Sequence, residues 1–180
     1  MGNVILGLLL LNPMTLYGLN KQFGAGVSLF YSASLGSIRS ALLTLLRTEL
    51  VTVAASVENG RNKRTYSITP TGRTAFAQWM LAPITSGDLE TTALAKLYLL
   101  GLVTVDERQV VLEDIVARIG ADEHALERTA VELDTIELPA RYHEIFRFQR
   151  LALDYGLQAH RNGRTFFEEA LRRERARVDP

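Results

Sequence analysis

The chain contains no cysteine, which excludes disulfide bonds, zinc–thiolate sites and cysteine nucleophiles. This composition suits a cytosolic protein, and we expect a cytoplasmic location. No apolar run approaches the roughly 20 residues that a membrane-spanning helix needs. Residues 4–11 are apolar but short, and they lack the basic leader and cleavage site of a signal peptide. We therefore predict a buried first helix over residues 3–11 and no membrane partner.

Patterns of catalytic and metal-binding residues are also missing. The three histidines, His124, His143 and His160, include no pair at the i, i+4 spacing of a metal-binding helix. The glycines of residues 24–26 precede no Gly-Lys-Ser/Thr, so they do not form a phosphate loop. The carboxylates of the second half are spaced as on solvated helix faces. We therefore predict no catalytic residues, no metal site, no cofactor and no enzymatic activity.

The formal net charge of zero conceals a division between the two halves. Residues 1–83 carry seven Lys and Arg against Glu49 and Glu58, which gives +5. Residues 84–180 carry the opposite balance, −5. A basic first half joined to an acidic second half predicts that only the first half binds a polyanion.

Residues 34–50 predict an amphipathic helix around which the first half is organised. Ser34 is the expected N-cap, because its hydroxyl can accept from a backbone N–H of the first turn. The predicted apolar stripe consists of Leu35, Ile38, Leu42, Leu45 and Leu46. The opposite face carries small hydroxyls and arginines: Ser37, Arg39, Ser40, Thr44 and Arg47. Such a helix suits the DNA major groove, although an ordinary surface helix has the same pattern.

A β-hairpin is predicted directly after this helix. Residues 51–57 are rich in β-branched side chains, residues 58–63 are polar with an Asn-Gly turn signal, and residues 64–69 form the return strand. The tip and return strand carry Arg61, Asn62, Lys63 and Arg64. A helix followed by a hairpin with a basic tip is the winged helix-turn-helix arrangement, in which the wing holds phosphates.

The elements on either side complete this arrangement. Thr15 is the expected cap of a helix through Phe23 that carries Lys21 outward. Thr69 and Pro70 are the expected cap and first residue of a helix after the hairpin.

Five motifs recur in a fixed order along about the first 80 residues: residues 5–9, Pro13-Met14 with Tyr17-Gly18, residues 34–38, Leu50-Val51 and residues 66–73. Together these motifs resemble the PadR family of bacterial transcriptional regulators. The sequence departs from the family pattern at Arg39 and Ser40, where an aromatic residue and a proline are common, and at Thr15-Leu16. Because these positions lie on or beside the expected DNA-reading face, no operator sequence can be transferred.

The second half predicts a separate helical domain. Residues 82–88 form a breaker segment, so we predict a winged helix-turn-helix domain over residues 1–83 and a helical dimerisation domain over 88–180. Helices are expected over residues 89–103, 106–138 and 141–160, and a last helix over 166–176. Residues 162–163 either interrupt the helix between these last two segments or are part of it. The helix over 106–138 has apolar residues every seven positions, with a polar gap at Asp122 and Glu123. The repeating residues are Leu112, Ile119, Leu126 and Leu133.

This half resembles, more loosely, the longer members of the same family, whose C-terminal helices pack against those of a second subunit. The resemblance places Phe166 and Phe167 near that interface and implies flat aromatic or phenolic effectors, although no ligand-binding residue can be assigned. Long helices that are apolar on several faces usually find a partner, which independently favours a homodimer. A helical bundle within one chain is the alternative.

The expected protein is mainly α-helical with a small hairpin wing, and it binds double-stranded DNA as a homodimeric repressor. The predicted DNA contacts are Lys21, Ser34, Ser37, Arg39, Ser40, Thr44, Arg61, Asn62, Lys63 and Arg64. Two alternatives remain: a winged helix used for protein contacts, and a small enzyme or ligand-sequestering helical protein without specific DNA binding.

Overall fold

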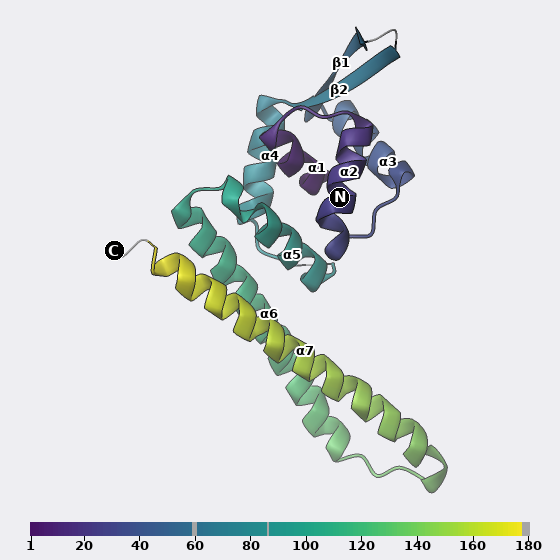
Figure 1. The fold of residues 1–180 in the computed structure, drawn as a ribbon. Helices are drawn as coiled ribbons and strands as arrows, with labels where there is room; N and C mark the ends of the chain where they lie inside the picture. Colours follow the sequence, from purple (N-terminus) through teal and green to yellow (C-terminus); the bar gives the residue numbers. More distant parts are fainter. Residues whose placement is uncertain (59–60, 86, 178–180) are drawn as a thin grey trace. The chain divides into compact units, whose positions relative to one another are not determined.

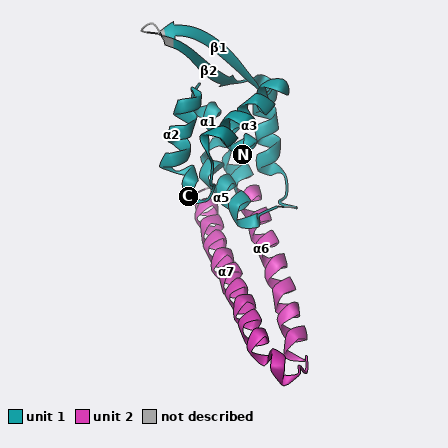
Figure 2. Ribbon diagram, turned by 90° about the vertical axis from the view of Figure 1, so that its right-hand side faces the viewer, with its two compact units in different colours: residues 1–108 teal, residues 109–180 magenta. Residues whose placement is uncertain are grey.

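The computed structural model describes residues 1–58, 61–85 and 87–177. The chain forms two compact units, Met1–Arg108 (unit 1) and Gln109–Pro180 (unit 2), which are coloured separately in Figure 2. The expected boundary at residues 83–88 falls inside unit 1, because the helix that follows it packs with the N-terminal helices. A functional division at that boundary stays a prediction.

Unit 1 is a set of short helices around an almost completely buried first helix. Its helices are α1 (Gly2–Leu11), α2 (Leu16–Ala25), α3 (Leu35–Arg47), α4 (Pro70–Leu81) and α5 (Leu89–Leu99), with 3₁₀ turns η1 (Val27–Leu29) and η2 (Leu100–Leu102). Six consecutive residues of α1, 4–9, are buried. At Gly7 an added Cβ would lie 2.7 Å from the Leu99 side chain, so α1 and α5 pack closely.

The predicted helix caps of unit 1 are confirmed. The Thr15 hydroxyl accepts from the Gly18 N–H at 3.0 Å, and the Thr69 hydroxyl accepts from the Gly72 N–H at 2.9 Å. Pro70 begins α4, where its missing N–H costs nothing. Short polar residues therefore set where these helices begin.

The predicted hairpin is also present, and it projects from the helices of unit 1 (Figure 1). Strands β1 (Val51–Glu58) and β2 (Arg61–Ile68) pair antiparallel, with Val51 opposite Ile68. Its base is held to the segment between α1 and α2, because the backbones of Met14 and Tyr66 exchange hydrogen bonds of 3.0 and 2.8 Å. The Asn-Gly turn predicted at residues 59–60 lies outside the described residues.

The junction between α3 and β1 is tightly built. The Leu50 N–H donates to the Leu45 carbonyl and the Glu49 N–H to the Leu46 carbonyl, which is a Schellman motif. Glu49 occupies its left-handed position with φ 58°, where glycine is usual. Gly72 approaches the same turn so closely that an added Cβ would lie 2.1 Å from the Leu50 carbonyl oxygen.

Unit 2 is formed by two long helices that run side by side in both ribbon views (Figures 1 and 2). They are α6 (Val105–Asp134), whose first residues 105–108 belong to unit 1, and α7 (His143–Arg175), joined through the short 3₁₀ turn η3 (Ala140–Tyr142). The helices are antiparallel, since Arg175 near the end of α7 pairs with Glu113 near the start of α6 at 2.6 Å. At the other end Arg150 pairs with Asp134 at 3.0 Å.

Glu123 provides the predicted polar gap in the apolar face of α6, but the expectation that its carboxylate is solvated is wrong. Glu123 is only 3% exposed, and its two carboxylate oxygens lie 3.1 Å from Arg161 and 2.9 Å from Arg164 of α7. Arg161 also binds Glu127, and this hydrogen bond holds the pKa of the Glu127 carboxyl below its usual value. The buried carboxylate of Glu123 is therefore paired with arginines that lie 38 or more positions further along the sequence.

The helix α7 continues through Asn162-Gly163, which resolves the alternative left open for that segment. Gly163 lies against α6, where an added Cβ would be 3.9 Å from the Ile119 side chain. None of the helices in the described part of the chain is long and apolar enough to cross a membrane.

Candidate nucleic-acid interface

The start of α3 is fixed by two serines. The Ser34 hydroxyl accepts from the Ser37 N–H at 3.1 Å, and the Ser37 hydroxyl accepts from the Ser34 N–H at 2.9 Å. This reciprocal pair is a capping box and confirms Ser34 as the N-cap. Both hydroxyls are thus engaged within the helix, although Ser34 remains exposed and Ser37 partly so.

The face of α3 opposite the core is open to solvent. Its predicted contact residues Arg39, Ser40 and Thr44 are all exposed, as is Arg47. The Thr44 hydroxyl donates to the Ser40 carbonyl at 3.3 Å, and the residue remains exposed. The inner face buries Ile38, Leu42 and Leu45 as predicted.

The assignment of Leu35 to the buried stripe is wrong, because its side chain is 51% exposed. Leu35 is the first helical residue, and no neighbouring element covers that turn sufficiently to bury it. Leu43, which the sequence analysis did not single out, is also exposed in the middle of the outer face. The sequence did indicate this exposure, because Leu43 lies four residues from both Arg39 and Arg47 and therefore on the same face of the helix.

The hairpin places its polar side chains on two faces. Lys63 stands opposite Ser56 and Arg64 opposite Ala55, and neighbouring residues of a strand point to opposite sides. Asn62 therefore shares a face with Arg64, whereas Lys63 is on the other. All three are exposed. A hairpin that enters a DNA groove has phosphates on both sides, so both of its faces can contact them. A hairpin that lies flat on a surface contacts that surface through one face only.

The remaining predicted contacts of unit 1 are Lys21 and Arg61. Lys21 is exposed on α2, the helix that packs on α3. The backbone of Arg61 pairs with Glu58 at the tip of the hairpin, and its side chain lies outside the described residues. Unit 1 as a whole carries nine Lys and Arg against six Asp and Glu. The excess is positive, as a surface for a polyanion requires.

In unit 2 most of the residues predicted to form the dimer interface instead pack against other residues of the same chain. Leu112, Ile119 and Phe167 are buried, and Leu126 lies near Gly156 of α7, where an added Cβ would be 3.8 Å away. Leu133 is partly buried and Phe166 is 56% exposed. The heptad repeat of α6 thus faces α7 of the same chain, and a dimer contact through these residues stays a prediction.

A different apolar surface of unit 2 remains open. Its members recur along α7 at heptad spacing and are exposed: Ile145, Phe148, Ala152, Tyr155, Ala159 and Phe166. We call this the outer seam of α7. Tyr155, in the middle, is 75% exposed. Of these residues, only Phe166 was predicted from the sequence to lie at an interface.

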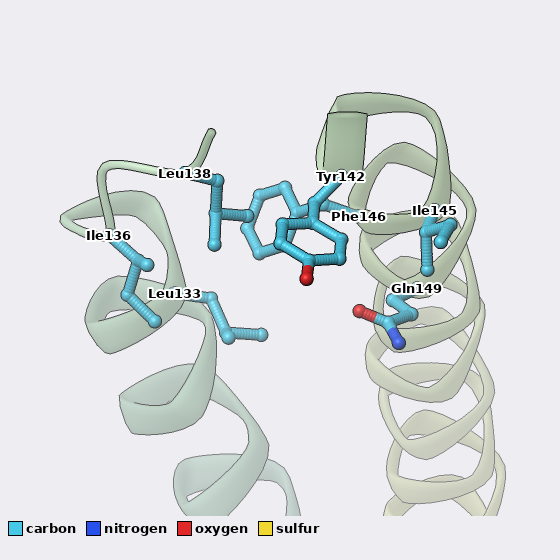
Figure 3. Close-up of a pocket in the computed structure, with 7 residues that line it drawn as sticks. All are labelled: Leu133, Ile136, Leu138, Tyr142, Ile145, Phe146 and Gln149. Atoms are coloured by element: carbon cyan, nitrogen blue, oxygen red, sulfur yellow. The ribbon is translucent and has the colours of Figure 1, made fainter. Parts of the chain in front are cut away.

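A cavity of about 310 Å³ lies at the end of unit 2 where α6 turns back into α7 (Figure 3). Its walls are apolar apart from one phenol and one amide: Leu133, Ile136, Leu138, Tyr142, Ile145, Phe146 and Gln149. In Figure 3 the Tyr142 hydroxyl and the Gln149 amide lie on the same side of the cavity, with the Phe146 ring behind Tyr142. Two aromatic side chains, those of Tyr142 and Phe146, therefore line this cavity.

Groups of three or more acidic, histidine or cysteine side chains that could hold a metal ion do not occur among the described residues.

Three helices with a capped, outward-facing α3 and a hairpin beyond it define unit 1 as a winged helix-turn-helix module. Residues 5–78 match the model of the transcriptional regulator PadR-like family. The resemblance noted from the motifs is confirmed over these residues, and the members of the matching family are transcriptional regulators.

The chain is also similar to solved structures along nearly its whole length. Bacillus subtilis PadR in complex with operator DNA is 20% identical, with 96% of this chain and 98% of that chain covered and a TM-score of 0.43. The same B. subtilis protein in complex with p-coumaric acid is 20% identical, with 96% and 94% covered and a TM-score of 0.41. The Vibrio cholerae virulence activator AphA is 24% identical, with 97% and 98% covered and a TM-score of 0.40. No curated protein sequence matches the chain.

Proposed function

We propose that this protein is a sequence-specific DNA-binding repressor that acts as a homodimer on a roughly palindromic operator. The single observation that carries the proposal is the outer face of α3. This helix is capped at its start and presents Arg39, Ser40 and Thr44 to solvent beside a basic hairpin. A helix of this diameter fits the major groove, where such side chains reach base edges.

The division of labour follows from side-chain chemistry. Arg39 and Ser40 near the N-terminal half of α3 would contact base edges or adjacent phosphates. Lys21, Lys63 and Arg64 would bind the phosphate backbone, which fixes the position of the protein but carries no sequence information. Arg61 and Asn62 belong to the same wing. Ser34 and Ser37 would contribute mainly through the capping box, since their hydroxyls already bond to each other's backbone N–H.

The outer seam of α7 supports the homodimer. A row of exposed apolar residues along a long helix is stabilised when it packs against a second such row. Two-fold pairing of identical seams is the simplest closed arrangement. It would present two α3 helices to half-sites about 34 Å apart, one turn of DNA.

The cavity at the end of unit 2 supports a small aromatic effector. Its volume suits a single-ring compound, and its walls are apolar with one phenolic hydroxyl and one amide available for hydrogen bonds. A phenolic or other aromatic molecule bound there would bias the arrangement of the dimer helices and release DNA. This role of the aromatic effector depends on the dimer being the form of the protein that binds DNA.

The first experiment is fluorescence anisotropy with the full-length protein, the duplex upstream of its own gene and a scrambled duplex, across a salt series. We expect tight, salt-dependent binding that prefers the native duplex by at least about 1,000-fold. Equally weak binding to both duplexes would contradict the expectation that the protein binds specifically upstream of its own gene. Absence of binding at low salt would favour a protein-interaction or ligand-sequestering module.

Matched variants separate the two kinds of contact. Lys63→Ala or Arg64→Ala should weaken native and scrambled duplexes alike and lower the slope of log K against log salt by about 1. Arg39→Ala should in addition reduce the preference for the native duplex, by about 1–3 kcal/mol. If Arg39→Ala weakens both duplexes equally, Arg39 contacts phosphate only. A promoter–reporter assay with and without the protein tests repression.

A further inference from the structure

An isolated exposed leucine is ordinary on a protein surface, but Leu43 is not isolated from the proposed interface. It is 57% exposed on α3 and lies four residues from both Arg39 and Arg47. Residues four apart stand one above the other on a helix, about 6 Å along the axis. Leu43 is therefore the centre of a row whose two ends are arginines.

The neighbouring row on the same face consists of Ser40 and Thr44, which are exposed as well. Leu43 is thus surrounded by polar groups on the part of the helix that would lie deepest in the groove. Long arginine side chains at the ends of the row can reach outward to guanines or phosphates. A leucine cannot hydrogen-bond, so its position calls for an apolar group on the DNA.

The major groove offers one such group on its base edges in unmodified DNA, the C5-methyl of thymine. Burying a leucine side chain against this methyl removes both from water, which is favourable in proportion to the apolar area. We propose that Leu43 is a specificity-determining residue that selects thymine at the centre of the α3 footprint in each half-site. This proposal rests on the proposed function and adds the base class that the helix prefers.

The test changes the DNA by a single methyl group and leaves the protein unaltered. A duplex is first enriched from a randomised pool by binding to the full-length protein, and each of its thymines is then replaced in turn by deoxyuridine. At one thymine in each half-site we expect the dissociation constant to rise about fourfold, the effect of one buried methyl group. Replacement of thymines elsewhere should have no comparable effect.

Two variants assign that effect to Leu43. Leu43→Ala should bind the thymine and deoxyuridine duplexes equally, because the methyl has lost its partner. Leu11→Ala removes a leucine that is 60% exposed on α1, and it should retain the fourfold discrimination. Because both leucines are exposed and alanine favours helices, circular dichroism should show both variants folded.

The outcomes are distinct. If the enriched duplex binds specifically but no thymine shows a methyl effect, the proposal for Leu43 is overturned and the proposed function stands. The same holds if Leu43→Ala keeps the discrimination. If no duplex is enriched and binding shows no salt dependence, both the proposed function and the role of Leu43 are overturned.

Discussion

Unit 1 and unit 2 bury apolar residues in different ways. In unit 1, α1 is enclosed by the other helices, and the capped helix starts and the Schellman turn close the chain around it. In unit 2, two antiparallel helices share one apolar face and leave the outer seam of α7 exposed. Two helices cannot cover each other on all sides, which supports the proposal that a second molecule packs on unit 2. The comparison indicates that unit 1 folds around its own core, whereas unit 2 leaves an apolar surface that the proposed dimer would cover.

The largest expected effect tests the self-contained packing of unit 1. Gly72→Ala should destabilise the protein by about 3 kcal/mol or more, because the new Cβ would lie 2.1 Å from the Leu50 carbonyl oxygen. Denaturant unfolding followed by circular dichroism measures this loss. Gly24→Ala is the matched control, since nothing lies within 4 Å of its Cβ position. An equal loss in both variants would contradict the role of this close approach.

The second prediction tests the incomplete packing of unit 2. Phe148→Glu combined with Tyr155→Glu places two carboxylates on the outer seam and should weaken self-association at least about 100-fold. Sedimentation at a series of concentrations measures this change. Gln158→Glu adds one carboxylate on the same helix beside the seam and should leave the association nearly unchanged. A double variant that remains dimeric would show that α7 does not form the interface through this seam.

The smallest expected effect concerns the turn that joins α3 to the wing. Glu49→Gly should stabilise the protein by about 0.5–1 kcal/mol, because glycine adopts the left-handed conformation at φ 58° without strain. Thermal unfolding measures the gain. Glu49→Ala removes the same charge but keeps the strain, so it should not produce the gain. Equal stabilisation by both variants would assign the effect to charge.

Local features of unit 1 were predictable because they depend on neighbouring residues. The caps Thr15, Ser34 and Thr69 were identified from short polar residues before apolar patterns, and all three accept the expected backbone hydrogen bond. The hairpin followed from β-branched residues around an Asn-Gly pair, and the structure extends β1 by one residue to Glu58. These signals act within a few residues of each other, so no tertiary contact is needed to interpret them.

The residue types of the candidate site were predictable from the sequence, but the face of the hairpin or helix on which each residue lies was not. Strand alternation separates Lys63 from Arg64, although the sequence alone placed both in one basic tip. The exposure of Leu43 was not foreseen, because a leucine in an amphipathic helix is expected to add to the core. Only the packing of α3 on its neighbours decides how wide the buried stripe is.

The sequence by itself determined where most helices and strands lie, which residues cap them and which half of the chain is basic. Tertiary structure alone decided which of the apolar faces of α6 and α7 is buried. It also decided that Glu123, expected in a polar gap, is enclosed by Arg161 and Arg164. The physical reason is that a repeat of apolar residues specifies a helix face but not its partner. Burial depends on residues that are tens of positions apart and meet only when the chain has folded.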